Sequence, residues 1–584
     1  MELAVRTWVD KFQKDHDLAR LKLDEAFEAF AGFCVLSAFC DTDFDPDAFR
    51  TGGGSDLGID AYGVVVNGEL LHDSAEVRTA VENATRLEVR FVLIQAKTSP
   101  NFETKVISDL GNNFKHVFSL SPLPYPASPD VENLRECIAA VYEHPAKLAS
   151  GLPKLDVRYV TTGKQVADMV QAKARDVEQT LKALDFFDAV EFRCVTVDEL
   201  RELRWQATEA ASATITMPKK IAMPAAPGVE QAQSGFLPAR ELVDKLLTVP
   251  SSGLIRKSLF VENVRDFQGY NKVNSEIRDT LRDPERGRRF AVLHNGITII
   301  ARHMKVVGDQ IHIEDYQIVN GCQTCHVLFD ERGLLTDEVH VPVRLVHSEN
   351  DNVIAEIVAS TNRQIAITED DLSAREEFHK RLEEDFAAQS ASRRLYYERR
   401  SKQYATYQDI EKTRIVYRRK LVQAYAAMFL GDPAGSGRYE RLMKSRRNEL
   451  FQADHLPIAY YTAASTSYRL EWLIRNGRIG AQYKPYRYHL LFSIMLRILG
   501  ASEIPGSPKA LQKLCAEVLD TVWDGSAAER LVLDIVPCLE RAAQRERARG
   551  VPVGELVRTN RFADEVRREL GIDRGRPQRV SGGK

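Results

Sequence analysis

The clearest strand-like pattern of apolar and polar positions lies between residues 58 and 97. Residues 58–66 are rich in β-branched side chains and end at Asn67-Gly68, the dipeptide that most easily adopts the positive φ angles of a two-residue hairpin turn. Residues 90–97 form a further strand-like run, in which a period of two places Gln95 and Lys97 on the same face. We therefore predict a hairpin followed by a strand with one polar face.

The pattern after this strand alternates between helical and extended segments. Residues 102–120 and 165–184 have helical patterning, residues 157–162 and 190–195 are strand-like, and a short helix is predicted from Val197. A helix, a three-stranded meander, and then alternating helices and strands form the order of a three-layer α/β domain. We assign this domain to residues 1–208.

Two further domains are predicted beyond this point. Residues 212–380 combine strands near 214–216 and 229–232 with a helix at 238–247, which indicates an α+β fold. Residues 381–572 are mainly helical, and residues 573–584 are expected to be a disordered tail. The helices expected after residue 381 are 420–430, 458–475, 486–499, 508–522 and 527–549.

Composition restricts the class of protein. The 584 residues are 44% hydrophobic, enough for several ordered domains, and no apolar run approaches the length of about 18 residues expected of a membrane span. The eight scattered cysteines favour reduced thiols, and the lone Cys322-x-x-Cys325 pair is weak evidence for zinc or haem. We expect a cytoplasmic protein without membrane contact. Because its net charge is only −3, nucleic-acid binding would need local basic patches.

Candidate chemistry is concentrated in the hairpin region. A strand with Asp60, followed after a hairpin by a strand with Gln95-x-Lys97, resembles the PD-(D/E)xK nuclease superfamily in the variant where Gln replaces the second acid. The resemblance implies that Asp60 and Gln95 bind Mg²⁺, for which Mn²⁺ is expected to substitute. It also implies that Lys97 offsets the charge developing on a phosphodiester. The alternative is that Asp60 caps a turn and Lys97 is a solvated strand end.

A third metal ligand is expected because the Gln95 carboxamide brings no charge. Relatives often place a Glu on the first helix of this fold, and residues 23–30 have helical composition with Glu25 and Glu28 on a similar face. We assign Glu28 as the ligand and keep Glu25 as the alternative.

A second resemblance covers roughly residues 215–435 and rests on six ordered motifs. The chain resembles the abortive-infection phage-resistance (AIPR) family, whose members often carry an N-terminal PD-(D/E)xK domain. The motifs occupy residues 259–267, 273–277, 294–299, 317–324, 360–364 and 395–400.

One of these motifs is a candidate ligand site. Asn320-Gly321 forms a turn directly before a helical run, and a helix N-terminus after a tight turn can bind an anion such as a nucleotide effector. Gln323 and Thr324 would be further donors, and Asn295 precedes a second such turn. A purely structural role in turns and helix caps is equally compatible with these residues.

Residues 393–420 form a basic, tyrosine-rich segment. They hold ten Lys or Arg residues against three acids, interleaved with five tyrosines. Cations that meet phosphates beside rings that stack on bases indicate a nucleic-acid surface, whereas a solvated helical face is the alternative. The residues assigned to nucleic-acid binding are Arg393, Arg394, Arg399, Arg400, Lys402, Arg418 and Arg419.

Together these features predict a Mg²⁺-dependent endonuclease of anti-phage defence, gated by its AIPR module. We expect DNA rather than RNA as substrate, a phage-derived or nucleotide trigger, and a homodimer. Two alternatives remain open: a nucleotide-responsive regulator with a degenerate nuclease domain, and a non-catalytic nucleic-acid binding protein.

Overall fold

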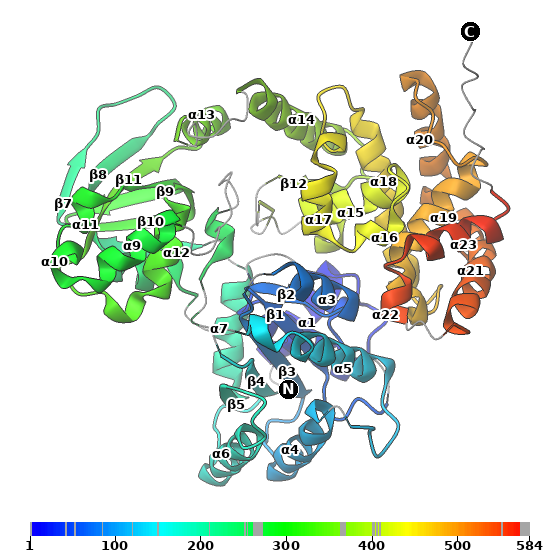
Figure 1. Ribbon diagram of the computed structural model, residues 1–584, viewed down its shortest axis with the longest axis horizontal. Helices are drawn as coiled ribbons and strands as arrows, with labels where there is room; N and C mark the ends of the chain where they lie inside the picture. Colours follow the sequence, from blue (N-terminus) through cyan, green and yellow to red (C-terminus); the bar gives the residue numbers. More distant parts are fainter. Residues whose placement is uncertain are drawn as a thin grey trace.

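The computed structural model divides into three parts (Figure 1), and no described helix is long and apolar enough to cross a membrane. It describes residues 3–572 except 41–43, 52–53, 85, 120, 149–150, 209–210, 250–252, 254, 261–271, 362–368, 400–402, 405–406, 408–409 and 550–552. The predicted disordered tail, 573–584, lies outside the described residues.

The N-terminal part is built on a five-stranded mixed sheet in the order β2-β1-β3-β4-β5. Strand β1 is antiparallel to β2 and β3, whereas β3, β4 and β5 run parallel. The strands are β1 (Ala61–Val66), β2 (Glu69–Leu71), β3 (Val89–Lys97), β4 (Lys154–Thr161) and β5 (Ala189–Val195).

The predicted hairpin is confirmed, but the predicted three-stranded meander is wrong. Asn67 and Gly68 have φ angles of 50° and 77°, and Val66 pairs with Glu69 across the turn. Helix α3 (Ser74–Asn83) then carries the chain from β2 around to the other edge of β1, so β3 pairs with β1 rather than with β2. The short β2 is left at the edge of the sheet.

Helices cover both faces of this sheet and complete a three-layer α/β arrangement. One core contains apolar residues of α1, α2 and α7 together with Val92, Ile94 and Ala96 of β3. The other contains residues of α3, α4, α5 and α6 together with Phe91 and Leu93. The helices not yet bounded are α1 (Leu3–Asp15), α2 (Leu23–Leu36), α4 (Thr104–Phe118), α5 (Pro129–Tyr142), α6 (Asp168–Lys182) and α7 (Val197–Thr208).

The middle part contains a six-stranded sheet in the order β6-β10-β9-β11-β8-β7. Its central pair, β9 and β11, is parallel, and its long hairpin joins β9 to β10. The strands are β6 (Ser212–Thr216), β7 (Lys219–Ala222), β8 (Gln231–Pro238), β9 (Ile297–Val307), β10 (Gln310–Asn320) and β11 (His340–His347). Its helices include α8 (Ala239–Glu241), a π-helical turn (Leu242–Leu247), α9 (Lys272–Arg282), α10 (Pro284–Gly287), α11 (Phe290–Leu293) and α12 (Cys322–Asp330).

Helices α13 (Asp351–Thr361) and α14 (Glu369–Ala387) lead from this sheet to a mainly helical part, as Figure 1 shows. A short pair, β12 (Tyr396–Glu398) and β13 (Ile415–Tyr417), precedes the helices. The predicted mixed α/β class and helical C-terminal region are confirmed. The remaining helices are α15 (Arg418–Met428), α16 (Pro433–Ser436), α17 (Tyr439–Ser445), α18 (Pro457–Arg475), α19 (Arg487–Leu499), α20 (Pro508–Trp523), α21 (Gly525–Arg547), α22 (Val553–Leu556) and α23 (Asn560–Glu569).

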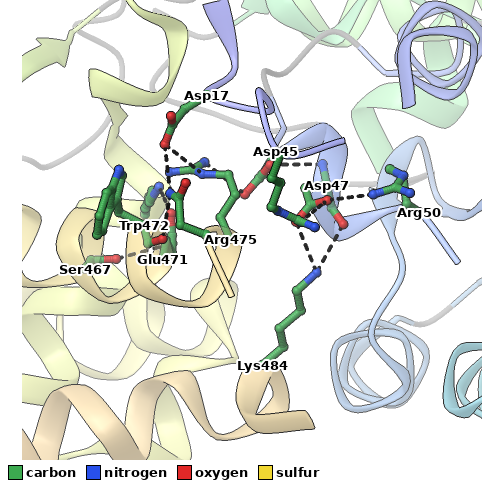
Figure 2. Close-up of polar contacts among 12 residues, drawn as sticks. Asp17, Asp45, Asp47, Arg50, Ser467, Glu471, Trp472, Arg475 and Lys484 are labelled. Carbon is green, nitrogen blue, oxygen red and sulfur yellow. Dashed lines mark hydrogen bonds and ion pairs between the residues drawn. The ribbon is translucent and has the colours of Figure 1, made fainter. Parts of the chain in front are cut away.

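The N-terminal part contacts the helical part through ion pairs to which it contributes the acidic residue. Asp47 contacts Lys484 with an Oδ2–Nζ distance of 3.5 Å, and Asp17 contacts Arg475 with an Oδ2–Nε distance of 3.6 Å (Figure 2). In these contacts the acid belongs to the N-terminal part and the base to the helical part. The same polarity holds for Asp45 with Arg475, Glu69 with Arg419, Asp73 with Arg487, and Glu82 with Arg558.

Candidate functional site

Asp60 lies directly before β1 and is held against the end of β3. Its backbone N–H donates to the Ile94 carbonyl at 2.8 Å, which extends the antiparallel pairing by one residue. Its side-chain Oδ2 accepts hydrogen bonds from the Ala96 backbone N–H at 2.6 Å and from Gln95 Nε2. Asp60 is only 6% exposed, and the hydrogen bonds from Gln95 and Ala96 hold its carboxylate in place.

The predicted partners of Asp60 on β3 occupy the expected face. Gln95 is 4% exposed and Lys97, two residues on, is exposed at the end of the strand. The turn before Asp60 packs on this face through Gly58, which has a φ of 79°. A Cβ on Gly58 would lie 3.0 Å from Gln95 Oε1 and 2.8 Å from Leu110 Cδ2, so the close approach favours glycine.

Glu28, on α2, is electrostatically part of the same group. Its pKa is raised to about 7, chiefly by burial and next by the neighbouring charge of Asp60, whereas Arg50 and Lys97 oppose the rise. Glu25 has a different role, because its Oε2 accepts the Lys22 backbone N–H at 2.8 Å and caps α2. Of the two predicted candidates, Glu28 is the one whose charge interacts with that of Asp60, and its role as a metal ligand stays a prediction.

Asp56 is a member of this group that the sequence analysis missed. Its Oδ1 accepts the Gly58 backbone N–H at 2.8 Å, and its charge raises the pKa of both Asp60 and Glu28. Burial is the largest cause that raises the pKa of Asp60 to about 6. The available signal was a second aspartate four residues before Asp60 in a glycine-rich turn.

The donor set fits a hard divalent cation through oxygen atoms. Asp60, Glu28 and the Gln95 carboxamide oxygen are the ligand types that Mg²⁺ accepts, together with water. The pKa values of Asp60 and Glu28 are raised because burial and the neighbouring acids outweigh the nearby cations Lys97 and Arg50. The side chains do not form a tight three-ligand set, because the one described group of three His, Cys, Asp or Glu ligand atoms within 4.8 Å is His303, His347 and Glu349. An ion at Asp60 would therefore need water or Gln95 to complete its shell.

At the predicted anion site, at the start of α12, two of the assigned side chains already contact other parts of the protein or are buried. Gly321 has a φ of 97° and precedes α12, and Asn320 pairs with Thr298 in the sheet. The Gln323 Oε1 accepts a hydrogen bond from Asn274 Nδ2 of α9 at 2.6 Å, and Thr324 is buried. Asn295 is exposed, three residues before Thr298. These contacts give the motif a role in joining α9, α12 and the sheet, and ligand binding there stays a prediction.

The motifs around α9, α12 and the sheet are those on which the AIPR resemblance was based. A match to a protein-family model covers part of the same region. Residues 260–524 match the family model described as AIPR protein. The AIPR region thus begins later and extends further than the predicted 215–435, reaching through α20. No curated protein and no solved structure matches the chain.

Several described cations of the basic segment 393–420 contact other parts of the protein. Arg393 pairs with Asp520 and Arg399 with Glu383, each at 3.1 Å, and Arg394 donates to the Gln389 carbonyl. Arg419 pairs across the domain contact with Glu69. Arg393, Arg394, Arg399 and Arg419 thus have partners within the protein, and their binding of nucleic acid stays a prediction. Arg418 is half-buried at the start of α15, and Arg400 and Lys402 lie outside the described residues.

Proposed function

We propose that the chain is a metal-dependent endonuclease whose reactive centre is the Asp60 group. The observation that carries the proposal is the meeting of Asp60, held by Gln95 and Ala96, with a second carboxylate, Glu28, and a lysine, Lys97, at one end of the sheet. A mixed sheet between helical layers, with Asp60 directly before its first strand, Gln95 and Lys97 on its third strand and Glu28 on a covering helix, supports the PD-(D/E)xK resemblance.

In this proposal the chain's own groups bind and orient the reactants. Asp60 and Glu28 would hold Mg²⁺, or Mn²⁺ in its place, with Gln95 fixing the Asp60 carboxylate. The ion would supply Lewis-acid activation of the phosphodiester and of the attacking water. Lys97, exposed at the end of β3, would approach the phosphate and stabilise the charge that develops on it.

The proposed biological role is phage defence by abortive infection, with DNA as the substrate, in the cytoplasm. It is supported by the AIPR region, which is joined to the N-terminal domain by the ion pairs described above. The docked arrangement gives the AIPR region a physical means of controlling the Asp60 site. A regulator with a degenerate nuclease domain is the alternative, because Gln95 lacks the charge of the usual second acid.

The test is cleavage by the purified full chain. Supercoiled plasmid, linear DNA and RNA are incubated with and without Mg²⁺ or Mn²⁺, using wild type, Asp60→Asn and Lys97→Ala. We expect wild type to cleave DNA and either variant to lose at least about a hundredfold in rate. Asp24→Asn is the matched control, because Asp24 lies exposed in the first turn of α2. Cleavage by Asp60→Asn at the wild-type rate would refute the assignment.

A further inference from the structure

A cavity of about 320 Å³ lies where the N-terminal domain meets the AIPR region. Its walls come from α1, α2 and α7 on one side and from β13, α15 and α18 on the other. Its volume is at the lower end of the range of about 300–1,000 Å³ that is usual for small-molecule sites. The site is separate from the Asp60 group.

One wall of the cavity is a continuous row of rings. Phe12 and His16 have centroids 4.5 Å apart, His16 and Phe33 5.3 Å, and Phe33 and Phe44 5.6 Å. Burial lowers the pKa of His16 to about 3, so this imidazole is neutral and belongs to the apolar wall. Such a row offers planar faces on which an aromatic base can stack.

The cavity is positively charged overall. Five Lys or Arg side chains line it against three Asp or Glu side chains. Lys11 and Lys412 reach it from opposite sides of the domain contact, on α1 and just before β13. An anionic group would therefore be attracted to the cavity.

Arg475 brings further hydrogen-bond donors to the cavity. It is 4% exposed, lines the cavity, and has Nε and Nη2 atoms that are buried without a hydrogen-bond acceptor. Figure 2 shows it between Asp17 and Asp45, at ion-pair distances of 3.6 and 3.9 Å. Unsatisfied buried donors are costly, and a phosphate oxygen would satisfy them.

We propose that this cavity binds a nucleoside monophosphate, with the base against the Phe12–Phe44 ring row and the phosphate near Arg475, Lys11 and Lys412. The ligand would contact both domains and strengthen their docking. Helix α2 carries Phe33 at the cavity and Glu28 at the candidate active site, so occupancy would also bear on that site. The binding claim does not depend on the proposed nuclease activity.

Calorimetry with the full chain tests the proposal. AMP, GMP, CMP and UMP are titrated singly, with adenosine and inorganic phosphate as separate arms. We expect at least one monophosphate to bind with a micromolar Kd, and the corresponding nucleoside and phosphate alone to bind at least tenfold more weakly.

The variants are Lys11→Ala, Lys412→Ala and Arg475→Gln, with Lys14→Ala as the matched control. Lys14 is exposed on α1 and does not line the cavity. We expect Lys11→Ala and Lys412→Ala each to weaken binding at least tenfold and Lys14→Ala to leave it unchanged. Since Arg475→Gln could impair folding, the two lysine variants decide the outcome, and Lys11→Ala is the cleaner of them because Lys412 also donates a hydrogen bond to the Tyr404 carbonyl at 2.8 Å. No binding of any monophosphate, or equal binding by wild type and both lysine variants, would overturn the proposal.

Discussion

At the scale of single residues, the carboxylates of the Asp60 site lower the stability of the folded protein when they are charged. Asp60 and Glu28 have pKa values raised to about 6 and about 7 from ordinary values of 3.8 and 4.5. Because the folded protein disfavours their charged forms, the site destabilises the fold increasingly as the pH rises above the ordinary values, and fully above the raised ones. The cost is absent below the ordinary values. Such a cost is typical of carboxylates arranged for a cation rather than for each other.

Neutralising Asp60 should therefore stabilise the metal-free protein. We expect Asp60→Asn to raise the melting temperature by at least about 2 °C near pH 8 and to lose that advantage near pH 4. Differential scanning calorimetry in EDTA measures the change, with Asp24→Asn as the control. A lower melting temperature for Asp60→Asn at both pH values would show that Asp60 serves the fold.

The same pKa shifts predict a pH-dependent response to metal. Mg²⁺ must displace the protons that the site holds, so its stabilising effect should be larger near pH 8 than near pH 5.5. We expect the rise in melting temperature to vanish in the double variant Asp60→Asn/Glu28→Gln. An equal rise in wild type and the double variant would place the responding ion elsewhere, for which His303, His347 and Glu349 are available.

At the scale of elements, local signals predicted the hairpin and several helices, whereas the strand order had to come from the structure. Asn67-Gly68 has a conformational preference of its own, so its turn was predictable. The pairing of β3 with β1 depends on where α3 carries the chain, which no short pattern encodes. The grouping of Asp56 and Glu28 with Asp60 likewise required the fold, although Glu28 was chosen through a family resemblance. The pairing of Arg393, Arg399 and Arg419 with acids was hidden because those acids are distant in sequence.

The turn before β1 offers a test of how tightly the site is built. Gly58→Ala forces a Cβ toward Gln95 and strains a φ of 79°, so we expect at least a tenfold loss of cleavage rate. Gly54→Ala is the matched control, since Gly54 has open space around it. The rates are compared at saturating Mg²⁺ with circular dichroism to verify folding. Wild-type cleavage by Gly58→Ala would mean that the turn does not position the reactive groups.

At the scale of the whole molecule, ion pairs join the N-terminal domain to the helical part. Burial alone would raise the pKa of Asp47, but Lys484, Arg20 and Arg50 outweigh burial and lower it. A lowered folded pKa means that this contribution to stability is present above the ordinary pKa of 3.8 and is lost as the pH falls through the lowered value. Arg50 also acts on Glu28, so Asp47 connects the domain contact to the candidate active site.

Removing one cation should loosen this contact. We expect Lys484→Met to speed hydrogen exchange severalfold in residues 44–51 and to make exchange there less sensitive to salt. Lys509→Met, at an exposed position on α20, is the control. Identical exchange in wild type and Lys484→Met would show that packing alone holds the two parts together.

The most direct test of the central claim is plasmid cleavage measured across Mg²⁺ concentrations for wild type and Asp60→Asn. We predict metal-dependent nicking or linearisation by wild type, none without metal, and at least about a hundredfold less by a folded Asp60→Asn protein. Metal-independent cleavage, or equal cleavage by the two proteins, would contradict the assignment of Asp60 to a metal-dependent nuclease site.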